Sequence, residues 1–159
     1  MIPLIQEEKT YKILFLGRMF LGLIFAYSGF IKLMEPVENF QGGMTAYEII
    51  PYALIPFLAR VIPWIEFLFG AFLILGYLPR VSALVLAVMS LSFVLLILTT
   101  RIVTGALPAN CGCFGEGSLL HLKPMEVLIM DVCNTVIGVR LAFLKTHPFG
   151  LSVLLKAKT

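Results

Sequence analysis

Charged residues are scarce in this sequence. Only 13% of its 159 residues are Asp, Glu, Lys or Arg, and 60% are hydrophobic. A soluble globular domain has about 25% charged residues, so this chain has too few of them to cover a surface that faces water. The formal net charge is +3, and the Lys and Arg residues form no basic patch. The lack of such a patch excludes nucleic acid as a partner. We therefore expect a lipid bilayer to cover this protein.

Two further features are missing. No small-residue cleavage site follows a short apolar core near the N-terminus, and Glu7 and Glu8 precede the first apolar run. Cleaved signal peptides have such a site after a positively charged start, so we expect the first apolar run to remain as a membrane anchor. The chain also has no internal repeat and no low-complexity segment. Its length then predicts a single domain, residues 1–159.

Long apolar runs dominate the rest of the chain. A helix needs about 20 residues to cross the core of a bilayer. Four runs reach this length, at residues 11–34, 52–78, 81–100 and 124–144. We therefore predict an all-α fold, an integral membrane four-helix bundle. Small residues four positions apart, Ala83 with Ala87 and Gly138 with Ala142, would let these helices pack closely.

Positive residues indicate how the helices are oriented. Lys and Arg stay preferentially on the cytoplasmic side of a membrane. They gather at one end of the predicted helices, at Lys9, Lys12, Arg80, Lys145, Lys156 and Lys158. We therefore place both termini in the cytoplasm of a multi-pass protein of the cell (inner) membrane. The segments 35–51 and 101–123 would face outwards.

The outward segment 35–51 has two interpretations. Residues 44–55 read MTAYEIIPYALI, and their aromatic side chains are typical of a membrane interface. They would form either a helix that lies in the interface, ended by Pro51, or an ordinary cap over the helices. We favour the cap.

Cysteine is rare, and two of the three cysteines lie together. Cys111 and Cys113 flank Gly112 in ALPANCGCFGEGS, on the predicted outward loop. An oxidising compartment preserves disulfides, and glycine supplies the backbone freedom that so tight a ring requires. Such a bridge closes too small a loop to stabilise the fold much, and strained or exposed disulfides tend to be labile and catalytic. We therefore predict a redox pair.

Other interpretations of the cysteines stay open. Cys111 and Cys113 would alternatively be inert, or would bind a metal with His121. Structural zinc usually takes four ligands, so we predict no metal site. The third cysteine, Cys133, lies inside the last apolar run, where we interpret it as a small buried hydrophobic residue. The alternative is a third thiol within reach of the loop.

Four ionisable residues lie inside the predicted helices: Arg18, Arg60, Glu66 and Asp131. Such residues normally face the interior of a helical membrane protein and have a partner. Their depths predict two pairs, Arg60 with Asp131 and Arg18 with Glu66. Pro63 frees a backbone carbonyl, so we expect a kink there that opens a polar pocket. The pairs would be either structural or part of a proton or quinone site.

Several motifs resemble those of a known family. R-x-x-L-G at residues 18–22, Y-S-G-x-x-K-L at residues 27–33 and P-W-I-E-x-x-x-G at residues 63–70 resemble the DoxX-like membrane proteins. N-C-G-C-F-G at residues 110–115 resembles the signature of their MauE branch, with Asn110 where Asp is frequent. The resemblance covers about residues 11–145.

This resemblance implies a four-helix membrane component of thiol–disulfide exchange, which works with a thioredoxin-like partner or a disulfide-containing client outside the cytoplasm. It implies Cys111 and Cys113 as the redox pair and, as supporting residues, Asn110, Gly112, Phe114 and Gly115. A quinone stays open as an electron acceptor, and no other cofactor is predicted. Two other function classes stay open, a non-catalytic assembly or scaffold subunit and a metal-ion carrier.

Overall fold

The computed structural model of this chain describes residues 2–45, 47, 49–105 and 123–143. The regular structure in these ranges is helical, which confirms the predicted all-α class, and no strand occurs in them. The helices are α1 (Ile2–Met34), α2 (Val37–Thr45), α3 (Ile55–Leu75), α4 (Pro79–Thr104) and α5 (Pro124–Phe143). Cys111 and Cys113, with the supporting residues predicted around them, lie outside the described residues.

Within the described residues, three helices are long and apolar enough to cross a membrane: residues Lys12–Met34 of α1, the whole of α3 and the whole of α4. Large apolar side chains on their outer faces are exposed, as in Phe20, Leu68 and Leu91. Contiguous exposed apolar surface of this kind marks contact with a membrane or a partner. The predicted fourth span, α5, has a lower apolar content because its 20 residues include Glu126, Asp131 and Arg140. The chain is therefore a membrane protein with three candidate spans.

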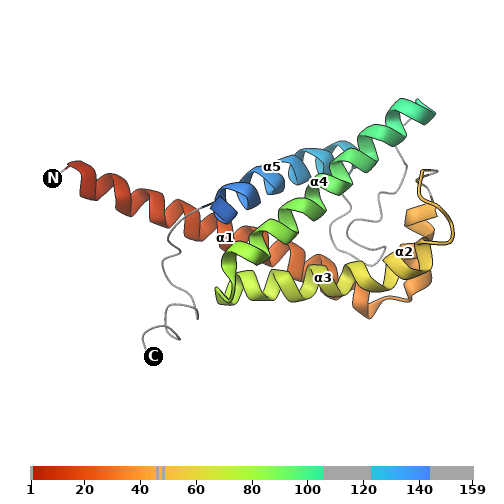
Figure 1. The fold of residues 1–159 in the computed structure, drawn as a ribbon, viewed down its shortest axis with the longest axis horizontal. Coiled ribbons are helices and arrows are strands. Elements are labelled where there is room, and N and C mark those ends of the chain that lie inside the picture. Colours follow the sequence, from red (N-terminus) through yellow and green to blue (C-terminus); the bar gives the residue numbers. More distant parts are fainter. Residues whose placement is uncertain (1, 46, 48, 106–122, 144–159) are drawn as a thin grey trace.

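The long helices pack in two antiparallel pairs, α1 with α3 and α4 with α5 (Figure 1). Contacts of α3 with α4 and of α1 with α5 join the two pairs. The turn between α3 and α4 is short because Gly76 adopts a left-handed conformation at φ 69°. Its N–H bonds the carbonyl of Leu73, and the next N–H, of Tyr77, bonds that of Phe72. Such bonds end a helix and satisfy its last carbonyls.

Each long helix buries residues at alternating spacings of three and four, which places them on one helical face. In α1 and α5 the buried stripes are Arg18, Leu21, Phe25, Ser28 and Lys32, and Val127, Asp131, Asn134, Gly138 and Leu141. In α3 the stripe is Ile55, Ala59, Pro63, Glu66, Gly70 and Leu73. These stripes carry polar side chains into the protein interior.

Small residues let the paired helices approach closely. A Cβ atom on Gly29 of α1 would lie 2.5 Å from the backbone nitrogen of Phe67 and 2.7 Å from the carbonyl oxygen of Pro63, both in α3. A Cβ on Gly138 of α5 would lie 2.9 Å from the Cβ of Ala87 and 3.0 Å from the carbonyl oxygen of Ala83, both in α4. The close packing predicted at these three small residues of α4 and α5 is therefore confirmed. The helix α3 stays continuous through Pro63.

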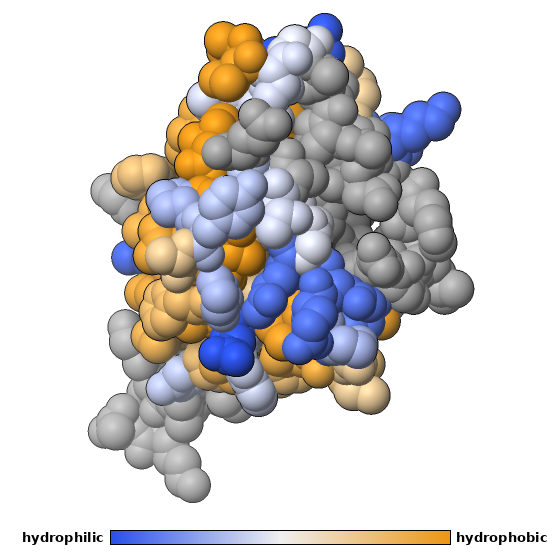
Figure 2. All heavy atoms as spheres, turned by 90° about the vertical axis from the view of Figure 1, so that its right-hand side faces the viewer, coloured by the Kyte–Doolittle hydropathy of each residue, from blue (hydrophilic) through white to orange (hydrophobic). Residues whose placement is uncertain are grey.

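The short helix α2 covers one end of the paired helices. It begins after Pro36, and its buried Phe40 and Met44 pack with Ile55 and Ala59 of α3. In the predicted segment itself, Tyr47 is buried and packs with Ile97 of α4 and Val127 of α5, which confirms the cap interpretation for the described residues. The alternative, an interfacial helix that runs up to Pro51, is wrong, because α2 ends at Thr45. Seen from this end of the molecule, hydrophilic residues gather together and apolar residues border them (Figure 2).

Candidate functional site

A buried ion pair joins α1 to α3. The ammonium nitrogen of Lys32 donates to both carboxylate oxygens of Glu66, at 2.9 Å to Oε1 and 2.8 Å to Oε2. The Ser28 hydroxyl, one turn before Lys32, donates to Oε2 of the same carboxylate at 3.2 Å. The two charged side chains are 0% and 2% exposed. Glu66 is therefore a fully bonded carboxylate held by two residues of one helical face.

Two aromatic rings enclose the ammonium group of Lys32. Its nitrogen lies 4.7 Å from the ring centre of Phe40, on α2, and 5.8 Å from that of Phe93, on α4. The negative face of an aromatic ring attracts a cation, most strongly where water is excluded. Lys32 lies near the end of α1, where a lysine would normally reach water. The helix α2 folds back over it and keeps it inside.

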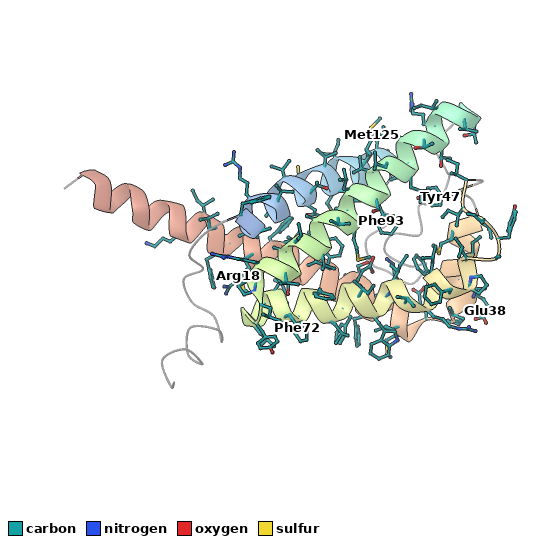
Figure 3. All side chains as sticks on the ribbon, viewed as in Figure 1. Arg18, Glu38, Tyr47, Phe72, Phe93 and Met125 are labelled. Carbon is teal, nitrogen blue, oxygen red and sulfur yellow. The ribbon has the colours of Figure 1, made fainter. Side chains whose placement is uncertain are left out.

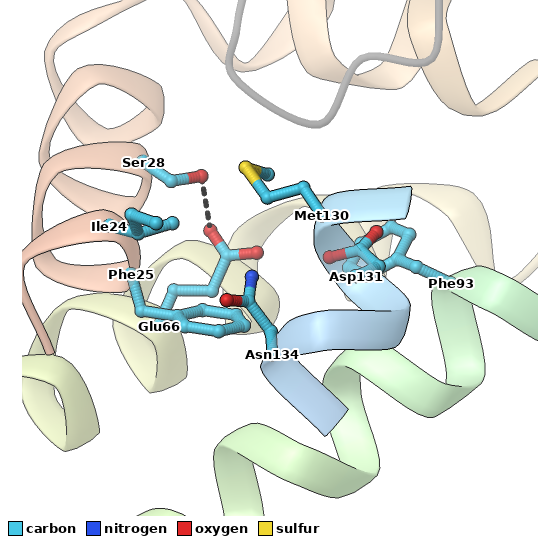
Figure 4. Close-up of a pocket in the computed structure, with 8 residues that line it drawn as sticks. All are labelled: Ile24, Phe25, Ser28, Glu66, Phe93, Met130, Asp131 and Asn134. Atoms are coloured by element: carbon cyan, nitrogen blue, oxygen red, sulfur yellow. Dashed lines mark hydrogen bonds between the residues drawn. The ribbon is translucent and has the colours of Figure 1, made fainter. Parts of the chain in front are cut away.

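A small cavity lies beside the ion pair, where α1, α3, α4 and α5 meet (Figure 4). It offers about 20 Å³ to the centre of a water-sized sphere. That is enough for a water molecule, whereas a cavity that binds benzene measures about 150 Å³. The cavity is therefore too small for the ring of a quinone. Its described lining is Ile24, Phe25, Ser28, Glu66, Phe93, Met130, Asp131 and Asn134.

Several buried polar atoms here have no hydrogen-bond partner of good geometry. In the lining of the cavity they are one carboxylate oxygen of Asp131 and both amide atoms of Asn134, and outside the lining the hydroxyl of Ser90 on α4 is another. The side chains of Asn134 and Ser90 nevertheless lie close enough to the Asp131 carboxyl group to interact with it directly. Ser90 and Asn134 are 0% exposed, and Asp131 is 5% exposed. A buried polar atom without a partner costs about 1–3 kcal/mol. We refer to Ser28, Lys32, Glu66, Ser90, Asp131 and Asn134 as the polar cluster.

Comparison with known proteins bears on the identity of this helical protein. The sequence matches the family described as methylamine utilisation protein MauE over residues 10–144. The chain belongs to the MauE family. The match includes most of α1, the whole of α3, α4 and α5, and the segment that carries Cys111 and Cys113. No curated protein and no solved structure matched the chain.

The predicted pairing of Glu66 with Arg18 is wrong. Along the length of the molecule Arg18 lies at the level of Phe72, in the second half of α3, whereas Phe93 marks the level of the polar cluster (Figure 3). Ten residues separate Arg18 from Ser28, which is about 15 Å along a helix. The guanidinium group of Arg18 is buried and lies 5.3 Å from the ring centre of Phe15, and its Nε has no hydrogen-bond partner.

The predicted pairing of Arg60 with Asp131 is also wrong. Arg60 is exposed, whereas Asp131 is buried, and no ion pair between these two described residues is present. Successive residues of a helix point in different directions around its axis. Arg60 directly follows the buried Ala59 and so falls outside the buried stripe of α3.

The interpretation of Cys133 as a buried residue is also wrong. Its side chain is exposed on α5, next to the surface formed by Val132 and Val136.

Of the six residues of the polar cluster in this MauE-family chain, only Glu66 and Asp131 were predicted from the sequence. Ser28, Ser90 and Asn134 carry no charge, and Lys32 lies at the end of an apolar run, where a lysine is normally solvated. The family motifs did point to part of the polar cluster. Ser28 and Lys32 are part of the motif at residues 27–33, and Glu66 is part of the motif at residues 63–70. Counting in steps of three and four from Asp131 would also have found Asn134.

Proposed function

We propose that this MauE-family protein is a membrane component of thiol–disulfide exchange, with Cys111 and Cys113 as the exchanging pair. The observation that carries the proposal is the sequence N-C-G-C-F-G at residues 110–115 in a member of this family. The family description associates such proteins with methylamine utilisation. The partner would be a thioredoxin-like protein, or a disulfide-containing client, outside the cytoplasm.

The exchange conserves electrons between the two proteins. A thiolate on one protein attacks a disulfide sulfur of the other, which forms a mixed disulfide and releases the second sulfur as a thiolate. The remaining thiolate of the attacking pair then displaces the bound sulfur. One pair ends as a disulfide, and the other has gained two electrons and takes up two protons. Gly112, Asn110, Phe114 and Gly115 would shape the backbone around the two sulfur atoms.

The arrangement of the helices supports an outward position for this pair. The helices α4 and α5 are antiparallel, and α4 ends and α5 begins at the same end of the molecule as α2 (Figure 1). Lys12 at the start of the first span and Arg80 in the first turn of α4 lie at the opposite end. Positive residues favour the cytoplasm, so this polarity supports cytoplasmic termini. We further propose that α5 is the fourth span of one four-helix bundle in the inner membrane, with Asp131 and Asn134 turned inward.

Mixed disulfides provide the test of the exchanging pair. When the protein is incubated with an oxidised thioredoxin-fold protein, we expect a covalent complex in non-reducing gels. It should accumulate when one loop cysteine is changed to serine, because the resolving thiol is then missing. The double variant Cys111→Ser/Cys113→Ser should form no complex. The matched control is Cys133→Ser, which removes the exposed thiol of α5 and should behave as the wild type. A complex that persists in the double variant would refute the proposal.

Chemical labelling tests the orientation. A membrane-impermeant maleimide added to intact cells after mild reduction should label Cys111 and Cys113 and should leave Cys133, on the apolar face of α5, unlabelled. A cysteine introduced at Lys12 should react only after the membrane has been opened. Labelling of the Lys12→Cys variant from outside would reverse the proposed orientation without affecting the assignment of the redox pair.

A further inference from the structure

The charges of the polar cluster do not balance. One ammonium group, of Lys32, lies with two buried carboxyl groups, of Glu66 and Asp131. Glu66 occupies that ammonium with both of its oxygens and also accepts a bond from Ser28. Asp131 is close enough to interact electrostatically with both charges, and the uncharged side chains of Asn134 and Ser90 also lie against its carboxyl group. One of its oxygens still has no hydrogen-bond partner of good geometry. Within the part of the chain that the structure describes, one negative charge would therefore be uncompensated if both acids were ionised.

The unpartnered atoms around the cavity indicate what occupies it. In the lining, the Asn134 amide offers N–H donors and a carbonyl acceptor, and the carboxyl group of Asp131 offers acceptor oxygens. A water molecule also donates and accepts, so it can satisfy such a mixed set, and the cavity is large enough for one. A bare metal cation cannot, because the amide nitrogen of Asn134 has no lone pair to offer it. The donor set therefore favours water over a metal ion.

We propose that this cavity is a proton-binding site in which Asp131 carries an exchangeable proton and a water molecule in the cavity bonds to Asp131 and Asn134, the two polar residues of α5 that line it. An isolated ionised carboxylate is strongly disfavoured in an interior of low dielectric constant, so the neutral acid prevails. When Asp131 releases its proton, the water in the cavity passes it on to bulk water, and the new carboxylate competes with Glu66 for the ammonium group of Lys32. The site thus stores one proton, independently of the proposed thiol exchange.

Few of the described charged groups lie near enough to Asp131 to affect its protonation. Among the described residues, the charged groups that face Asp131 are Lys32 from α1 and Glu66 from α3, and α4 contributes the uncharged Ser90 and Phe93. The next acid along α5, Glu126, is exposed and accepts a bond from the backbone nitrogen of its neighbour Lys123. Loss of the Glu66 charge would therefore release Lys32 to Asp131, which would then ionise.

Asp131 is the one aspartate in the whole sequence, so isotope labelling reports on it without any substitution. Cell-free synthesis with aspartate ¹³C-labelled at its side-chain carboxyl, followed by reconstitution in lipid nanodiscs, gives one carboxyl resonance. At mildly acidic pH, where free aspartate with its pKa of about 3.9 is ionised, we expect the chemical shift of a carboxylic acid. It should move to that of a carboxylate as the pH is raised. A carboxylate signal throughout would overturn the proposal.

Two further measurements sharpen the test. At the same mildly acidic pH, Glu66→Gln should give the carboxylate signal, whereas Glu38→Gln, at an exposed acid on α2, should give the acid signal of the wild type. A Glu66→Gln variant that keeps the acid signal would overturn the competition for Lys32. The wild-type spectrum should also be the same in sodium and in choline salts. A carboxylate signal that requires sodium would replace the proton with a metal cation and overturn the proposal.

Discussion

Replacing Lys32 by Met is expected to lower the free energy of unfolding by about 3–5 kcal/mol, the usual effect of removing one partner of a buried ion pair. The ammonium group of Lys32 binds both carboxylate oxygens of Glu66 in a site that excludes solvent. The variant would leave Glu66 and Asp131 without a described counter-charge. Equilibrium unfolding in mixed detergent and SDS micelles, followed by circular dichroism, measures the change.

Companion variants separate the ion pair from a general effect of the substitution. Arg60→Met removes an exposed cation from α3 and should change the free energy of unfolding by no more than about 0.5 kcal/mol. Glu66→Gln should cost less than Lys32→Met, because Asp131 can take over the ammonium group. The double variant Lys32→Met/Glu66→Leu should recover stability, since apolar residues often replace a buried pair without loss. A Lys32→Met protein as stable as the wild type would contradict the buried pair.

Replacing Gly29 by Ala is expected to destabilise the protein by about 1–3 kcal/mol, as overpacking of a close-packed core does, and Gly29→Val by more. The new Cβ would lie 2.5 Å from the Phe67 nitrogen, 2.7 Å from the Pro63 oxygen and 3.0 Å from the Cβ of Glu66. Two of these atoms belong to the backbone of α3, so the whole helix must shift. The shift would also displace Glu66 from Lys32. The same unfolding experiment measures the loss.

The matched control is Gly42→Ala in α2. A Cβ at Gly42 would meet nothing within 4 Å, and alanine is favoured over glycine inside a helix by about 0.5–1 kcal/mol. This variant should therefore be as stable as the wild type or slightly more so. If Gly29→Ala matched it, the two helices would not be as close as the structure places them.

Much of the helical architecture could be predicted from the sequence. Helices form from local interactions, and apolar runs of about 20 residues are strong evidence for membrane spans. The predicted runs at residues 11–34, 52–78 and 81–100 correspond to candidate spans, and the run at residues 124–144 corresponds to the helix α5. The redox pair at Cys111 and Cys113 also comes from the sequence and stays a prediction. Depth along a helix axis, however, was a poor guide to partners, because it ignores rotation about that axis.

Two residues show why the partners required the folded protein. Arg18 and Lys32 lie on the same buried stripe of α1, so rotation alone does not choose between them as the partner of Glu66. The choice follows from the close contact of Gly29 with Pro63 and Phe67, which sets the register of α1 against α3 and brings Lys32 level with Glu66. The cap α2 then excludes water from a lysine that the sequence places at a helix end.

The amino-acid sequence thus establishes that this is a helical membrane protein with polar residues inside its helices and a Cys-Gly-Cys pair between the last two. Local hydropathy and spacing contain that information. The pairing of Lys32 with Glu66 and the uncompensated position of Asp131 arise only when four helices meet. Such contacts depend on the packing of small residues between segments that are far apart in the chain, and no local pattern specifies them.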